Sequence, residues 1–299
     1  MSKQILLIAA FCLTGLLSAS ATAASSESAT AASESATSAS ESATAASRSA
    51  TAASRRATAL SNATPVISDS ITARDLVAQA IDLTRGITSY TELSMLVHRP
   101  DWQRSSRMVS WTRGRGDALI HFTEPAKDAG NGTLKQGEKM WTYTPKLNRT
   151  IRLPFSLMSQ SWAGSDFSYN DLSRTDKLLS YYELSISSVE EVDGHRQYTI
   201  SAIPYDDAPV VWGKEEWVLR DDSVLIKQTF FDQDLVPLKS LETLEIGELG
   251  GRTFGIHMRM RKLDEPDKYT ELRYHNAQFD IDIDDRMFTL FALKARGKI

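Results

Sequence analysis

The chain has 299 residues, of which 41% are hydrophobic and 24% charged, and this is enough apolar material for one sizeable globular domain. Its 34 lysine and arginine residues against 38 aspartate and glutamate residues give a net charge of −4. That balance argues against a nucleic-acid-binding protein, which would present a basic surface. The single cysteine leaves no disulfide framework within the chain.

The first 23 residues have the pattern of a signal peptide. A short positive start with Lys3 is followed by an apolar run from Ile5 to Leu17, and Ala21 and Ala23 supply the small residues that signal peptidase requires. The run is shorter than the roughly 20 apolar residues of a membrane-spanning helix. We therefore expect export, cleavage after about Ala23, and a mature protein without Cys12.

Residues 24–65 repeat a seven-residue unit rich in serine, alanine and threonine, as in ASSESAT and AASESAT. A seven-residue period also occurs in coiled coils, but alanine is nearly the only apolar residue that these repeats offer. A segment that buries so little cannot offset its ordering entropy. We interpret residues 24–65 as a disordered spacer and residues 66–299 as a single folded domain.

The predicted domain begins with an amphipathic helix. Thr72 and Asp75 have the spacing of a capping box, apolar residues recur on one face from Leu76 to Ile81, and Gly86 is a natural stop. After Gly86 the period of the apolar residues changes from 3.6 to 2. Alternation then predicts strands at 90–97, 107–112, 117–122, 139–143, 184–192, 197–203, 214–219, 225–231, 237–249, 254–263 and 269–281.

Short Gly- and Asp-containing turns connect these strands, at 113–117, 135–138, 192–195, 220–223 and 248–252. Short connections predict consecutive antiparallel hairpins. Ile256, Met258 and Met260 occupy alternate positions of one strand and share a face, which one N-terminal helix cannot cover over so many strands. We expect a mainly β (α+β) fold, with a large curved antiparallel sheet forming a half-open barrel around an apolar cavity.

Catalytic motifs are lacking in the sequence. It contains no G-x-S-x-G, no H-E-x-x-H, no phosphate loop and no dinucleotide fingerprint, and no two of its five histidines have metal-ligand spacing on one predicted element. We therefore predict no catalytic residue, no metal and no cofactor, and a monomeric protein. A hydrolase with an unrecognised site is the least favoured of the functions considered.

An aromatic cluster interrupts the strands between Trp141 and Tyr182, and ordinary core packing is one explanation for it. The segment from Pro154 to Gly164 is not strand-like, however, and an apolar insertion across the mouth of a curved sheet would form a lid. We predict that residues 161–182 are this lid, with a short helix anchored by Asp166 and Asp171 and with Gly164 as its hinge. The candidate cavity and lid residues are Trp141, Tyr143, Phe155, Leu157, Met158, Trp162, Gly164, Phe167, Tyr169, Leu172, Trp217, Phe230, Ile256, Met258 and Met260.

Three segments carry a resemblance to a known family. The run YTPKLNRTIRLPFSLMSQSWAGSDFSYNDL at 143–172, LRDDSVLIKQTFFDQD at 219–234 and FDIDIDDRMFTLFAL at 279–293 resemble the outer-membrane lipoprotein-sorting protein family, periplasmic relatives of the lipoprotein carrier LolA. The resemblance covers most of Leu76 to Leu293 and excludes the repeats. Asn170 is a departure, because an acidic residue is usual there in the family.

The resemblance implies a LolA/LolB-like half-barrel closed over by helices, with a cavity that holds acyl chains in the periplasm. It also implies two kinds of partner: lipoprotein or lipid acyl chains, and an inner-membrane transporter of the resistance-nodulation-division type. We expect a non-enzymatic carrier or chaperone. The alternative is an interaction subunit of an inner-membrane lipid exporter, with a barrel filled by its own side chains.

Overall fold

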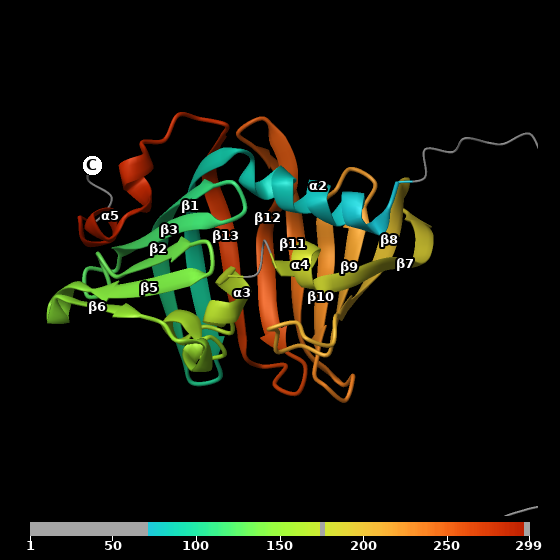
Figure 1. Cartoon of the computed structure of the whole chain (residues 1–299), viewed down its shortest axis with the longest axis horizontal. Coiled ribbons are helices and arrows are strands. Elements are labelled where there is room, and N and C mark those ends of the chain that lie inside the picture. Colours follow the sequence, from blue (N-terminus) through green and yellow to red (C-terminus); the bar gives the residue numbers. More distant parts are fainter. Residues whose placement is uncertain (1–70, 174–176, 296–299) are drawn as a thin grey trace, which may run out of the picture. The chain divides into compact units, whose positions relative to one another are not determined.

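The computed structural model of the protein describes residues 71–173 and 177–295, so the predicted signal peptide and repeats lie outside the described residues. These ranges form one 13-stranded antiparallel sheet in the order β6-β5-β4-β3-β2-β1-β13-β12-β11-β10-β9-β8-β7 (Figure 1). The strands are β1 Thr88–Arg99, β2 Trp102–Arg113, β3 Asp117–Glu124, β4 Gly132–Gln136, β5 Lys139–Thr144, β6 Arg149–Arg152, β7 Tyr182–Val192, β8 His195–Pro204, β9 Lys214–Arg220, β10 Leu225–Phe231, β11 Pro237–Leu249, β12 Arg252–Lys262 and β13 Tyr269–Phe279.

One longer helix precedes the strands, and short helices connect or follow them. They are α2 Ala73–Arg85, η1 Pro145–Leu147, η2 Phe155–Leu157, η3 Trp162–Gly164, α3 Tyr169–Ser173, α4 Lys177–Tyr181, η4 Asp285–Phe288 and α5 Leu290–Lys294. The prediction of a mainly β fold with a large open antiparallel sheet and an N-terminal helix is confirmed. β4 and β6 were not predicted, because both are short and mix polar with apolar residues without clear alternation.

Helix α2 has the ends that its sequence predicts. The Thr72 side chain accepts a hydrogen bond from the Asp75 amide, and the Asp75 side chain accepts one from the Thr72 amide in return, which completes a capping box. At the other end Gly86 has φ 61°, and its N–H donates to the Asp82 carbonyl. These caps fix the register of the apolar face.

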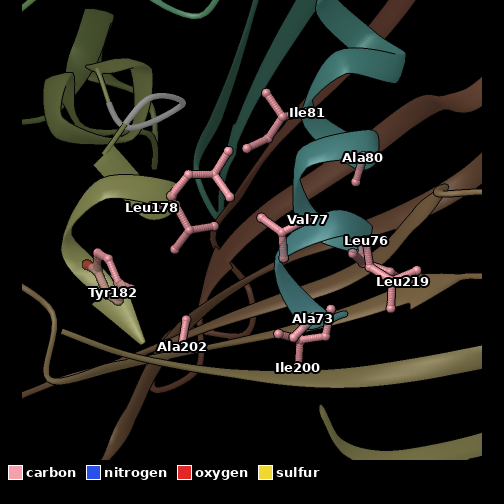
Figure 2. Close-up of a cluster of buried hydrophobic side chains, with 11 residues drawn as sticks. Ala73, Leu76, Val77, Ala80, Ile81, Leu178, Tyr182, Ile200, Ala202 and Leu219 are labelled. Atoms are coloured by element: carbon pink, nitrogen blue, oxygen red, sulfur yellow. The ribbon is translucent and has the colours of Figure 1, made fainter. Parts of the chain in front are cut away.

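That apolar face packs on strands β7, β8 and β9 near one edge of the sheet (Figure 2). Leu76 and Val77 are fully buried, and they form one cluster with Ile200 of β8 and Leu219 of β9. Leu178 of α4 joins the cluster on the side of α2 to which Val77 and Ile81 point. Since a buried Val or Leu side chain contributes about 1.5–3 kcal/mol, this cluster fixes α2 to the sheet.

The sheet curls, because strands far apart in its order border the same space. Met140 of β5 and Trp217 of β9 line one cavity, although nine inter-strand steps separate β5 from β9. In a flat sheet those steps of about 4.8 Å would place the two strands about 43 Å apart. Neither edge strand pairs with the other within the described residues, so the sheet remains open.

The other face of the sheet is covered at the β3–β5 end. Register places Trp111, Leu119, Leu134 and Trp141 in one row across β2, β3, β4 and β5, and this row packs against Phe288 and the helix α5. Because side chains alternate along a strand, the neighbours Ala118, Lys135 and Met140 point to the cavity face instead. The β3–β5 region is thus buried on both faces.

Candidate functional site

A cavity of about 350 Å³ lies on the inner face of the curled sheet, under α2. This volume falls within the range of about 300–1,000 Å³ that small-molecule sites occupy. Its walls come from α2, from strands β1–β5 on one side and β9–β13 on the other, and from residues 161–173, here called the cover segment. The cover segment, α2 and α4 lie on the same face of the sheet (Figure 1).

Most of the cavity wall is apolar. From the β9–β13 side it is lined by Trp217, Phe230, Leu241, Met258, Met260 and Leu272; from the β1–β3 side by Leu93, Met108 and Ile120; and from the cover segment by Trp162, Phe167 and Leu172. Several of these side chains also belong to one buried cluster in which Met260 is 1% and Phe230 2% exposed. A wall of this composition favours alkyl chains through the hydrophobic effect.

One end of the wall is polar. Ser89, Thr91, Ser110 and Thr112 of β1 and β2 face the cavity close to the last turn of α2, together with Thr133 of β4. The charged residues Arg85 and Lys135 border the same end. Polar groups are therefore concentrated at this end of the cavity, and Asp171, Ser223 and Gln228 are scattered polar residues elsewhere in the wall.

The cover segment is built around a reversal of the chain at η3. The Trp162 N–H donates to the Phe167 carbonyl at 2.7 Å, and Ala163 and Gly164 between them both have positive φ, at 51° and 69°. Gly164 accommodates this backbone without a Cβ penalty. The reversal directs the Trp162 indole inward, where its Nε1–H donates to Thr133 Oγ1 at 3.1 Å and its ring packs on Phe122.

Asp166 ties the cover segment to strands β1 and β13. Its carboxylate pairs with the Arg99 guanidinium at 3.0 Å and accepts the Thr270 hydroxyl at 2.7 Å. The Asp166 N–H in turn donates to the Thr270 oxygen at 3.0 Å. The Asp166 side chain is only 6% exposed, so the pair is largely shielded from water.

Asp171 makes the second tie, to β11. Its carboxylate lies 2.5 Å from Lys239 Nζ, and both side chains are less than a tenth exposed. The same carboxylate accepts the Ser168 N–H, while the Ser168 hydroxyl accepts the Asp171 N–H, so Ser168 and Asp171 form a capping box at the start of α3. Lys239 further contacts the faces of Trp212 and Phe230, which joins the tie to the cavity wall.

Seven of the predicted site residues border the cavity. They are Trp162, Phe167, Leu172, Trp217, Phe230, Met258 and Met260. Tyr169 lies beside them in the buried cluster, and burial raises the pKa of its hydroxyl. Met158 is buried without lining the cavity, and Leu157 is half-buried.

The remaining predicted residues lie elsewhere for reasons of strand parity and packing. Trp141 and Tyr143 point to the opposite face, toward α5, because Met140, the residue before Trp141, points to the cavity and side chains alternate along the strand. The Ile256 side chain lies over Gly247 of β11 and is not among the lining residues. Phe155 is 59% exposed, and Gly164 lies beside the Arg104 guanidinium at the surface.

The sequence interpretation missed the wall contributed by α2 and β1–β3. Leu93, Met108 and Ile120 lie in predicted strands, and Ala80 and Ile81 on the predicted apolar helix face. Their alternation was visible, but it gives two faces without saying which one encloses the cavity. Only the pairing of β1 with both β2 and β13 places these side chains opposite the methionines of β12.

One cluster outside the cavity has the residue types of a cation site. His195 at the start of β8 and Asp221 and Asp222 in the turn after β9 bring their ligand atoms within 4.8 Å of one another. Asp221 accepts hydrogen bonds from His195 Nδ1 at 2.8 Å and from the Arg196 N–H, which lower its pKa. Asp222 pairs with the Arg220 guanidinium. A guanidinium inside the cluster opposes a second cation, so we describe it as an ion-pair network.

Comparison with solved structures identifies the fold. A DUF1329 family protein from Desulfovibrio piger is 21% identical, with a TM-score of 0.67 over 74% of this chain and 97% of that one. A putative outer membrane lipoprotein-sorting protein domain from Vibrio parahaemolyticus is 21% identical, with a TM-score of 0.65 over 74% and 97%. A LolA superfamily protein from Nitrosomonas europaea is 19% identical, with a TM-score of 0.63 over 74% and 99%.

These likenesses confirm the LolA-like fold that the sequence resemblance implied. No helix in residues 71–173 and 177–295 is long and apolar enough to cross a membrane. A comparison with curated proteins finds no match. A family model described as "uncharacterized protein" matches residues 114–295, which is more than half of the sequence, and the chain belongs to that family.

Proposed function

We propose that the protein is a periplasmic carrier that holds the acyl chains of a lipid or lipoprotein in its cavity during transfer toward the outer membrane. The observation that carries the proposal is the apolar cavity enclosed by the sheet, α2 and the cover segment. The LolA-superfamily fold supports it, as does the shared fold with a lipoprotein-sorting domain. The proposal assigns the protein no catalytic residue.

The energetics of transfer explain why such a cavity is needed. Each CH₂ group removed from water contributes about 0.8 kcal/mol, so a 16-carbon chain contributes roughly 12 kcal/mol. Spontaneous transfer through water is therefore very slow. Methionine and aromatic side chains in the wall offer an apolar environment that adapts to the shape of the chain.

The proposal includes the predicted localisation of the protein and the predicted division of the chain into segments. Residues 1–23 would be removed on export, residues 24–65 would act as a spacer, and residues 66–299 would form the carrier domain. An inner-membrane transporter of the resistance-nodulation-division type is the candidate donor of cargo. The intact mass of the protein from a periplasmic fraction tests export and cleavage, and a mass that includes residues 1–23 would contradict them.

The direct test is to purify the mature protein without detergent and to record its native mass spectrum. We expect a discrete adduct that denaturation releases and that lipid extraction identifies as a molecule with acyl chains. A clean apo mass, with no uptake after addition of liposomes or lipopeptide, would overturn the carrier function. That result would favour the alternative of a docking subunit.

A charge introduced into the cavity wall tests whether the lipid binds there. Met258→Glu introduces a carboxylate on the apolar side of the cavity, and we expect the lipid adduct to be lost. Leu244→Glu is the matched control, because Leu244 is 42% exposed and lies outside the cavity lining. Equal lipid retention by the two folded variants would contradict the proposed binding site.

A further inference from the structure

Hydroxyl groups form two adjacent rows across the cavity face of strands β1 to β4. Register aligns Ser89, Thr112, Ala118 and Lys135 in the first row. It aligns Thr91, Ser110, Ile120 and Thr133 in the second. All eight residues border the cavity, and five of them carry a hydroxyl group. We call these five residues the hydroxyl rows.

The rows end abruptly where the apolar wall begins. The next pair along β1 and β2 is Leu93 with Met108, which is apolar. Further along, Met95 of β1 and Met258 of β12 both pair with Leu272 of β13, so the two methionines lie at the same level of the sheet. Six residue-to-residue steps of extended strand lead from Ser89 to Met95, which corresponds to about 20 Å. An extended acyl chain can therefore run from the hydroxyl rows toward Met258 and Met260.

Part of the hydrogen-bonding capacity of these rows is used within the protein. Ser89 Oγ and Thr112 Oγ1 share a hydrogen bond of 2.6 Å, and Thr133 Oγ1 accepts the Trp162 indole N–H at 3.1 Å. Within the described residues, the hydroxyl groups of Thr91 and Ser110 make no hydrogen bond, and neither oxygen is among the fully buried unpaired atoms, so both remain accessible from the cavity. Thr91 is only 7% exposed, and both residues face the cavity.

A hydroxyl in an apolar wall costs about 1–3 kcal/mol once a ligand displaces the water around it without taking over its hydrogen bond. Valine has the shape of threonine and packs well in strands. Valine in place of the threonines would therefore give this part of the sheet an apolar wall of the same shape. Arg85 and Lys135 border the same end and make it electropositive, with the Arg85 guanidinium donating to the Gly114 and Asp117 carbonyls and Lys135 Nζ held at 2.8 Å from the Gly116 carbonyl. This end is therefore suited to a polar group of a ligand.

We propose, on the basis of the proposed carrier function, that the hydroxyl rows bind the carbonyl oxygen of an acyl head group and so orient the chain in the cavity. The acyl carbonyl lies at Thr91 and Ser110, near the last turn of α2, and the tail extends toward Met258 and Met260. The carbonyl belongs either to a free fatty acid, as a carboxylate, or to an acyl ester. The ligand class is thus an acyl compound with an enclosed head group.

The test uses three ligands with the same chain length: lauric acid, methyl laurate and dodecane. Each displaces the neutral fluorescent probe N-phenyl-1-naphthylamine from the mature protein, and the dissociation constant is measured for each. The variant is Thr91→Val with Ser110→Ala, which removes both hydroxyl groups and nearly preserves volume. The control is Thr123→Val with Ser105→Ala, at exposed positions of β3 and β2.

We expect the cavity variant to weaken binding of the laurates about tenfold and to leave dodecane unchanged, since two hydrogen bonds are lost. Weakening of lauric acid alone assigns the carboxylate as the head group, and weakening of both laurates assigns the acyl carbonyl of an ester. The control variant binds all three ligands as the unmodified protein does. Equal melting temperatures of the variants establish that the fold is intact.

Two results would overturn the inference, and they differ in what else they imply. In the first, lauric acid, methyl laurate and dodecane have equal dissociation constants, and the substitutions change none of them. The cavity then binds apolar chains without recognising a head group. The carrier function then stands and the head-group site does not. If none of the three ligands displaces the probe, the carrier function fails as well.

Discussion

Helix α2 and the cover segment lie over the same face of the sheet and border the same cavity, but only the cover segment adds buried ion pairs to its apolar contacts. The α2 attachment is apolar, through fully buried residues such as Leu76 and Val77. The cover segment is held by the two buried ion pairs of Asp166 and Asp171, in addition to the Trp162 contacts. The difference indicates which of the two elements is able to move.

Separating an apolar interface exposes hydrocarbon, and nothing in water offsets that cost. A buried ion pair differs, because its attraction only partly outweighs the desolvation of its two charges, and opening restores their hydration. Breaking the two ion pairs of the cover segment is therefore partly compensated by solvent, although exposing Trp162 and Phe167 is not, whereas lifting α2 has no such compensation for its apolar face. We expect the cover segment to open for loading and α2 to remain fixed.

The largest effect should come from truncating the apolar attachment. Leu76→Ala leaves a cavity under α2, and we expect the free energy of unfolding to fall by about 2–5 kcal/mol. Urea denaturation measures it. Leu147→Ala is the matched control, because Leu147 is 71% exposed, and it should change stability by less than about 0.5 kcal/mol. A similar loss in both variants would show that α2 is not the main apolar attachment.

A smaller and more local effect should follow from weakening the polar attachment. Asp166→Asn removes the charge that pairs with Arg99, at an expected cost of about 1.5–3 kcal/mol, confined to the cover segment. Hydrogen exchange should then accelerate at residues 161–173 and stay unchanged in α2. The control is Asp101→Asn, at an exposed position in the turn between β1 and β2.

Two hydrogen-exchange results would contradict independent opening of the cover segment. If the cover-segment amides of the unmodified protein are already as protected as those of central strands, and Asp166→Asn does not change them, the segment is a fixed part of the core. Accelerated exchange in α2 as well would show that the two attachments open together.

The same contrast explains what the sequence was able to predict. Helix α2 was predictable with both ends, because its capping box and its apolar period lie within a single stretch of contiguous residues. The turns and most strands followed from similarly local patterns. The ties of the cover segment were not accessible in this way, because 67 positions separate Arg99 from Asp166 and 104 separate Asp166 from Thr270.

The cavity wall illustrates the same limit at the level of single residues. Met140 and Trp141 are neighbours in an alternating strand, and the local pattern does not say which of them faces inward. The answer depends on α5, which covers Trp141 from more than a hundred residues away in the sequence. Aromatic content favoured Trp141, whereas Met140 borders the cavity.

Helix α5 provides an intermediate case, because it combines both kinds of attachment on the opposite face. Leu293 is fully buried against β3 and β4, and its carbonyl lies 3.0 Å from Nε2 of His121, a histidine that is only 1% exposed. Burial lowers the pKa of His121 below its usual value, and the hydrogen bond to Leu293 opposes this only in part. The neutral imidazole therefore donates Nε2–H to the carbonyl.

The sign of the resulting pH dependence follows from proton binding. Below about pH 6.5 the unfolded chain protonates this histidine while the folded protein does not, so stability is complete above pH 6.5 and falls as the pH is lowered toward the folded-state pKa. The slope should reach at most about 1.4 kcal/mol per pH unit. We expect His121→Phe to remove this slope from urea titrations, and His275→Gln, at an exposed position of β13, to retain it. An unchanged slope in His121→Phe would assign the acid sensitivity to other groups and leave α5 as an apolar attachment like that of α2.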